Sequence, residues 1–380
     1  MKPLGFAVAF ALTVLASNSG SGAESPTPPP TKPVIANDAI AKAAVAADGA
    51  WSAVNTWATA AKEKIHEAAG RTSTTPSEKP VAPEAATQES LGGGKYVAGK
   101  SFGEDDRLGQ ISAVAVGRND TLVVAAGEKI YFFNPSSEKS ERSFDTGEPK
   151  IATIALDEDS IYVFGEQTRS EEKVINGRTR NIMVPLGVTC KVFSWDGKEK
   201  RSMDLKPLLS VKSARIYDGE LYAADLARRT ISLFDPMTGQ FKSEIKPPAR
   251  LCCGIFHFAI DPANGDIVLA NLGAFKLQRY GKDGGLKSEF GERGEADQSF
   301  HGCCNPVSSA VLPDGNLVVT EKDPSRVKIY TPDGRLLEDF KNLKELVSGC
   351  NRVLVASDSK GRVYLGVNSG KQFVVQYAQK

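Results

Sequence analysis

Residues 308–340 read SSAVLPDGNLVVTEKDPSRVKIYTPDGRLLEDF, and this stretch decides the fold. Four short apolar runs alternate with polar breaks, and two of the breaks carry the same Pro-Asp-Gly turn, at residues 313–315 and 332–334. β-Branched and aromatic residues favour strands, and Asp-Gly favours tight turns. The stretch therefore predicts four consecutive antiparallel strands, which form one sheet.

The same order of strands and turns recurs from residue 95 to residue 380. Further copies begin at Ile111, Ile151, Ser213 and His257, and a last one covers 352–380. Turns near residues 119, 158, 218, 265, 315 and 361 give a period of roughly 40–50 residues, the length of a β-propeller blade. A charged insertion, Thr168–Pro185, stretches the second copy and is interpreted as an exposed loop and a partner contact. The sequence predicts an all-β, six-bladed β-propeller over residues 95–380.

The last copy lacks a fourth strand, because the sequence stops after its third strand, QFVVQY. Residues 95–103, KYVAGKSFG, are similar to the fourth strands of other copies and have no preceding strands of their own. We expect them to complete the last blade and so remove an open sheet edge.

These repeats resemble those of a known family. The run PDGNLVV followed by RVKIYTPDG resembles the NHL-repeat family of six-bladed β-propellers over residues 95–380. The resemblance implies a binding platform, a sensor or, in some members, an enzyme. Amidating lyases of similar fold use a histidine-lined metal site, whereas this propeller has only His257 and His301; the metal-binding set of sugar-lactonase relatives has no match either. Paired cysteines are not part of the NHL pattern.

The N-terminal region predicts export. Residues 1–23 combine Lys2, an apolar run and the small residues Ser21-Gly22-Ala23, which is typical of a signal peptide; a retained anchor helix is the alternative. Residues 24–34 form a Pro-rich spacer, and no second apolar run of membrane length follows. We therefore expect a periplasmic or secreted protein without a membrane span in the mature chain.

Residues 35–70 predict an Ala-rich helix. Apolar residues from Ile40 to Ile65 step by four and three, which is heptad spacing. The helix is either a self-association segment or a lone helix, because alanines bury little surface. Residues 71–94 are rich in Pro, Gly and polar residues and are expected to form a disordered linker.

The charge balance excludes one class of partner. The chain has 47 Lys and Arg against 46 Asp and Glu, a net charge of +1. A nucleic-acid-binding protein normally concentrates positive charge. We expect no nucleic-acid partner.

Cysteines recur at one fixed place in the last three copies. Cys253, Cys304 and Cys350 each stand six residues before an alanine of the first strand of a blade, and Cys252 and Cys303 precede two of them. Blades are related by rotation, so these five thiols and His301 should gather on one face beside the central channel. Cys190 falls in a third strand and is interpreted as a buried core thiol.

Three explanations of the thiol-rich face remain open at this point. Export favours disulfides between neighbouring blades, since a bond between adjacent cysteines is sterically disfavoured. Thiolates with His301 also suit copper, zinc or an iron–sulfur cluster, although Cys-Cys lacks the usual ligand spacing. The third is a redox-active disulfide. His257 either faces the channel or is an ordinary core histidine, and its position slightly favours the latter.

No sequence motif names a reaction. The chain shows no Ser-His-acid set, nucleotide-binding loop or paired-carboxylate motif. The leading interpretation is a binding module that takes an unknown protein or small-molecule ligand at the propeller face; the sequence favours a role without catalysis but does not decide it. The alternative is a metal- or iron–sulfur-binding redox protein that uses Cys252, Cys253, Cys303, Cys304, Cys350, His301 and His257.

Overall fold

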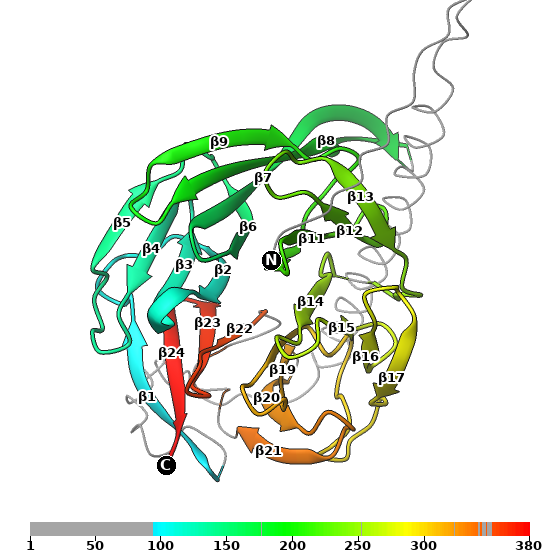
Figure 1. Cartoon of the computed structure of the whole chain (residues 1–380). Coiled ribbons are helices and arrows are strands. Elements are labelled where there is room, and N and C mark those ends of the chain that lie inside the picture. Colours follow the sequence, from blue (N-terminus) through cyan, green and yellow to red (C-terminus); the bar gives the residue numbers. More distant parts are fainter. Residues whose placement is uncertain are drawn as a thin grey trace, which may run out of the picture. The chain divides into compact units, whose positions relative to one another are not determined.

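The computed structural model describes residues 94–380 except 176, 252, 323, 341–342, 344–346 and 348–351. The predicted signal peptide, spacer and helix 35–70, and all but the last residue of the linker, lie outside the described residues. Within the described part, strands form six four-stranded antiparallel sheets, and one short helical turn, η2 (Arg118–Asp120), follows the first inner strand (Figure 1). The all-β propeller prediction is confirmed.

Blades 1 to 5 have their strands in chain order from the inside outward, and blade 6 takes its outermost strand, β1, from the other end of the propeller chain. Blades 1 and 2 consist of β2 (Ile111–Val116), β3 (Leu122–Ala126), β4 (Lys129–Phe133), β5 (Arg142–Asp145), β6 (Ile151–Leu156), β7 (Ser160–Ile175), β8 (Arg178–Ser194) and β9 (Glu199–Asp204). Blades 3 and 4 consist of β10 (Ser213–Tyr217), β11 (Glu220–Asp225), β12 (Thr230–Phe234), β13 (Phe241–Ile245), β14 (His257–Ile260), β15 (Ile267–Asn271), β16 (Lys276–Tyr280) and β17 (Leu286–Phe290). Blades 5 and 6 consist of β18 (Ser308–Val311), β19 (Leu317–Lys322), β20 (Ser325–Tyr330), β21 (Leu336–Phe340), β22 (Leu354–Ser357), β23 (Val363–Ser369), β24 (Lys371–Gln379) and β1 (Tyr96–Phe102).

The six inner strands form a closed ring. Each of them neighbours the inner strand of the next blade, and β22 of blade 6 neighbours β2 of blade 1 (Figure 1). The second strands are almost wholly buried, because both of their faces pack against adjacent blades. Aromatic pairs join blades farther out: Phe340 and Tyr377 have ring centroids 4.7 Å apart, and Phe290 and Tyr330 have theirs 5.3 Å apart.

The expected closing strand is present. β1 pairs antiparallel with β24, from Tyr96 opposite Gln379 to Phe102 opposite Val374. Phe102 is fully buried between blade 6 and blade 1. A second contact joins blade 6 to blade 1. The Asn368 side chain accepts a hydrogen bond from the Ile111 N–H and donates one to the Ile111 carbonyl, both at 2.8 Å. The ends of the propeller chain thus meet in one blade.

The charged insertion of blade 2 is not a loop. β7 and β8 continue past their sheet neighbours as a hairpin, paired from Thr168 opposite Pro185 to Ile175 opposite Arg178. The prediction of a loop was wrong because the charged residues are followed by the apolar run that contains the β-branched Ile182 and Val184, and β-branched residues suit a strand. The predicted exposure is correct, since Val174 and Met183 are 72% and 58% exposed.

Acidic residues after the second strands have the structural role that their position indicates. Asp225 accepts hydrogen bonds from the backbone N–H groups of Leu209 and Ala227, each at 2.9 Å. Glu321 accepts from the His301 N–H at 2.8 Å and forms a fully buried ion pair with Lys328 at 2.7 Å. These contacts fix the loops that lead into the inner strands. The described residues include no helix with the length and apolar character that crossing a membrane requires.

Candidate functional site in the central channel

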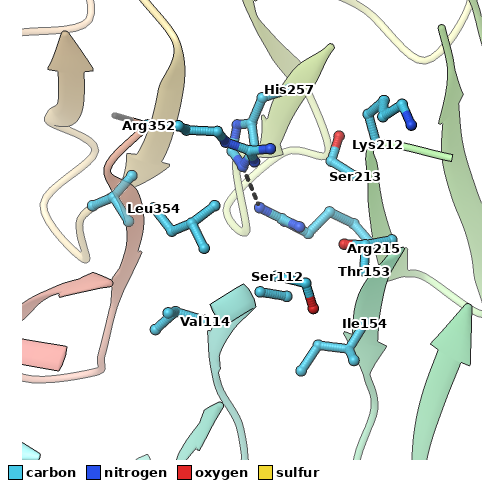
Figure 2. A pocket seen from close by; sticks show the side chains of 12 residues that line it. Ser112, Val114, Thr153, Ile154, Lys212, Ser213, Arg215, His257, Arg352 and Leu354 are labelled. Carbon is cyan, nitrogen blue, oxygen red and sulfur yellow. Dashed lines mark hydrogen bonds between the residues drawn. The ribbon is translucent and has the colours of Figure 1, made fainter. Parts of the chain in front are cut away.

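The inner strands surround a small cavity of about 290 Å³, open volume at its mouth included. Its polar lining residues are Ser112, Thr153, Lys212, Ser213, Arg215, His257 and Arg352. Figure 2 shows Arg215 reaching across from β10 toward His257 at the start of β14, and the side chain of Arg352 extending toward the same imidazole. Ala113, Val114, Ile154, Leu354 and Val355 complete the wall.

Arg215 is an exception in an otherwise uniform ring. The strand registers place one residue of each inner strand at an equivalent position, opposite the second or third residue of the next strand: Ala115, Ala155, Arg215, Ala259, Ala310 and Ala356. The five alanines pack in the apolar clusters between blades. The sixth position instead holds a guanidinium that borders the cavity.

The cavity has uncompensated positive charge. None of its lining residues is acidic, and Lys212 is already paired with Glu166 at 2.8 Å. Burial among the blades lowers the pKa of Arg215 to about 10, and burial together with the charge of Arg215 does the same to Arg352. No carboxylate of the described residues offsets either guanidinium.

One donor of Arg352 also lacks a hydrogen bond among the described residues. Its Nε is buried and has no hydrogen-bond partner among the described residues. The Arg215 guanidinium has a hydrogen bond, since its Nη1 donates to the Ala214 carbonyl at 2.7 Å. A buried donor without an acceptor costs about 1–3 kcal/mol, and more when it is charged. The cavity thus lacks a negatively charged acceptor.

His257 adds a further donor. The backbone N–H of Ser309 lies 3.3 Å from His257 Nδ1, and Arg215 Nη2 lies 3.3 Å from His257 Nε2. A neutral imidazole has one acceptor nitrogen, so only one of these donors can be satisfied. Since a buried backbone N–H requires a partner, we assign the acceptor to Nδ1 and the proton to Nε2. The Nε2–H and the Nη2 of Arg215 then both lack an acceptor in the same place.

The imidazole is held neutral. Burial and the nearby charges of Arg215 and Arg352 lower the pKa of His257 well below its ordinary value of 6.5. A histidine whose folded-state pKa is depressed binds its proton first in the unfolded chain, so it reduces stability as pH falls below about 6.5. It is therefore a fixed donor at neutral pH.

We expect replacement of His257 by glutamine to reduce acid destabilisation. Below about pH 6.5 the native protein should lose up to about 1.4 kcal/mol of unfolding free energy per pH unit from this residue alone. The His257→Gln variant does not lose this unfolding free energy, because it lacks the imidazole, and all other titrating groups are the same in both proteins. Urea denaturation of both proteins at pH 7.5 and 5.5 measures the difference, and equal losses in the two proteins would contradict the assignment.

The loops that carry the cysteines lead into the inner strands at the end where His257 lies. Cys253 precedes β14 and Cys304 precedes β18, and both have positive φ, 57° and 63°. The Cys253 loop contacts blade 5: Lys322 Nζ at the end of β19 donates to Cys253 Sγ at 2.8 Å, and Cys304 packs against the apolar cluster that contains Ile255. Cys252 and Cys350 lie outside the described residues.

The described sulfur atoms differ in state. Cys304 is disulfide-bonded, and the Sγ of the exposed Cys303 lies 3.3 Å from that of Cys304. Cys190 is fully buried in β8, as its position in the third strand predicts, and burial raises the pKa of its thiol.

We expect three cysteines to react differently with iodoacetamide. In the folded, unreduced protein Cys303 should be alkylated, whereas Cys304 is protected by its disulfide and Cys190 by burial. Reduction should expose Cys304, and denaturation should expose Cys190. Peptide mass spectrometry after each step measures this, and alkylation of Cys304 before reduction would contradict it.

His301 is fixed by groups other than the thiols that are described. Its Nε2 lies 3.0 Å from the Ala296 carbonyl and 2.7 Å from Arg326 Nη1. Among the described residues no group of three or more His, Cys, Asp or Glu side chains is arranged to hold a metal ion. His257 lines the channel cavity, whereas no cysteine is among the described residues that line it.

Comparison with known proteins supports the fold and goes no further. No protein-family profile matches the chain, and no curated protein is similar in sequence. Among solved structures, a streptogramin B lyase is similar with a TM-score of 0.51 and 11% identity, covering 78% of this chain and 100% of its own. A catalytically inactive histidine variant of virginiamycin B lyase from Staphylococcus aureus, with quinupristin, is similar with the same TM-score and identity, covering 75% and 100%. These likenesses show a β-propeller, and the NHL assignment remains a resemblance.

Proposed function

We propose that this protein is an exported β-propeller binding module that captures an anionic group of its ligand in the central channel. Export rests on the signal-like residues 1–23, and the module character on the absence of any catalytic motif in the sequence. The anionic chemistry rests on the channel. The wall supplies donors and positive charge, and its described residues supply no carboxylate.

The observation that carries the proposal is the pair of guanidiniums, Arg215 and Arg352, which line one cavity without a carboxylate; both residues are partly buried, and the Nε of Arg352 is fully buried. Two like charges in a shielded site repel each other and have lost hydration. An oxyanion between them would restore the lost interactions through charge-assisted hydrogen bonds, about twice as strong as neutral ones. The Nε2–H of His257 is placed to join them.

The size of the cavity limits what enters it. Its accessible space is about 20 Å³, which is room for about one water molecule. A carboxylate, phosphate or sulfate group would therefore place one oxygen there, while the rest of the ion or of a larger ligand stays at the mouth.

Calorimetric titration with sulfate, phosphate and acetate at constant ionic strength tests the proposal. We expect at least one of these anions to bind in the channel and to raise the melting temperature. Arg215→Ala, which makes the alanine ring uniform, should weaken binding about tenfold or more, whereas the exposed Arg335→Ala should not. Comparing a short peptide acid with its amide tells whether a terminal carboxylate is also accepted. Binding that is equal in native protein and Arg215→Ala would overturn the channel site.

The thiol-rich face is a second candidate. The contact of Cys303 with the disulfide-bonded Cys304, and that of Lys322 with Cys253, favour a structural or redox-active disulfide there. A thiolate-bound copper, zinc or iron–sulfur centre is the other form of this candidate. Thiol counting with and without reductant, with metal analysis of protein purified without oxygen, separates the two forms. Stoichiometric metal that is lost in Cys303→Ser and Cys304→Ser would favour the metal centre.

A further inference from the structure

The hairpin formed by residues 166–187 of β7 and β8 extends beyond the sheet of blade 2, and we call it the arm. β6 pairs with β7 only as far as Gly165, and β9 pairs with β8 only from Thr189 onward. Past these points, β7 and β8 pair only with each other among the described residues. Figure 1 shows the two strands running on past their neighbours.

The arm is therefore a two-stranded ribbon with two open edges. Isolated two-stranded ribbons are marginally stable in water, and a third strand is the usual remedy. Its side chains include large apolar groups that nothing described covers: Val174, Met183 and Leu186 are 72%, 58% and 52% exposed. Such an arm has the character of a docking element.

One face of the arm is cationic. Paired residues of neighbouring strands share a face, so Arg169, Lys173, Arg178 and Arg180 lie on the same side, together with the single acid Glu171. Glu171 forms ion pairs with Arg169 and, at 3.7 Å, with Lys173. The face thus has a net charge of +3 on a protein whose total is +1.

Two of these cations have no acidic neighbour. Arg178 and Arg180 are exposed and form no ion pair among the described residues. They stand two residues apart on β8, whose outer edge is open. Pro185 has no N–H to offer a further strand, so the edge that can form a regular ladder runs from Arg178 to Val184.

We infer that the arm binds an acidic, extended peptide segment of a partner protein, which adds as a third strand along the open edge of β8. Main-chain hydrogen bonds from Arg178 to Val184 would hold the segment, which is the way that exposed sheet edges capture peptides. Carboxylates at alternate positions of the segment would face Arg178 and Arg180. This site is independent of the channel.

The test uses a fluorescein-labelled peptide that alternates glutamate and threonine and is as long as the open edge. Fluorescence polarisation should show binding to the full chain that weakens with added salt. Arg178→Glu combined with Arg180→Glu should weaken it about tenfold or more. Arg335→Glu combined with Lys371→Glu makes the same change in net charge away from the arm and should leave it unchanged.

Backbone chemistry separates strand addition from charge attraction. The same peptide with alternate amides N-methylated keeps its carboxylates but cannot form the ladder, and it should lose binding. Undiminished binding of the methylated peptide, or no binding up to about 1 mM, would overturn the proposal. So would binding to phosphatidylglycerol vesicles without peptide binding, or self-association through the arm that the Arg178 and Arg180 changes abolish.

Discussion

Replacing Arg352 with methionine should make the ligand-free protein more stable and remove its response to anions. The guanidinium lies in one cavity with that of Arg215 without a carboxylate, and its buried Nε has no hydrogen-bond partner among the described residues. Methionine keeps an unbranched side chain against the apolar wall and removes the charge. We expect a gain on the order of 1 kcal/mol in urea denaturation without added oxyanion, toward the low end of the range found when buried ion pairs are replaced by apolar residues. Sulfate, which should stabilise the native protein, should not stabilise the variant.

The matched control for this prediction is Arg335→Met. Arg335 is exposed and its side chain lies outside the channel, so its replacement should change stability by less than about 0.5 kcal/mol and leave the anion response intact. The account fails if Arg352→Met is destabilised and still responds to sulfate like the native protein. A loss of stability would mean that the guanidinium supports the fold in the way that ordinary buried polar groups do.

Removing residues 95–103 should prevent the propeller from folding. These residues supply β1, which covers β24 from Val374 to Gln379, and they supply Phe102, which is buried against Phe133 and Tyr364. Without them blade 6 has three strands and an open apolar edge. We expect aggregation on expression. In the full chain Phe102→Ala should cost about 3–5 kcal/mol of unfolding free energy.

A chain that begins at residue 94 and retains β1 is the control for this deletion. It has lost nearly all of the N-terminal residues and none of the propeller strands, so it should be soluble and unfold cooperatively. Solubility after expression and circular dichroism during thermal unfolding compare the two chains. Cooperative unfolding of the chain without residues 95–103 at an unchanged temperature would contradict closure by β1.

Much of the fold could be predicted because the sequence pattern of one blade recurs in six copies. A turn chemistry that recurs at a regular period identifies the blades, and an incomplete last copy identifies the closing strand. The strands of the arm were not predicted, because a run of charged residues is also typical of an exposed loop. In a ribbon with both faces in water, polar side chains are compatible with strands, so polarity did not distinguish the two.

Only part of the channel site could be predicted from the sequence. His257 was a candidate, but Arg215 and Arg352 were not, because an arginine in a repeat protein is usually a surface residue. A signal for Arg215 existed: the register that aligns Ala259, Ala310 and Ala356 also aligns Arg215, the one position that breaks the series. Arg352 gave no such signal. Its burial arises from the closing of the ring, which brings residues distant in sequence together.

Anomalous scattering from crystals grown with selenate shows directly whether the channel binds an anion. We expect an anomalous peak within hydrogen-bonding distance of the Arg215 guanidinium and His257 Nε2, and its disappearance in Arg215→Ala. Selenate bound only at surface sites, with the channel holding water alone, would contradict it.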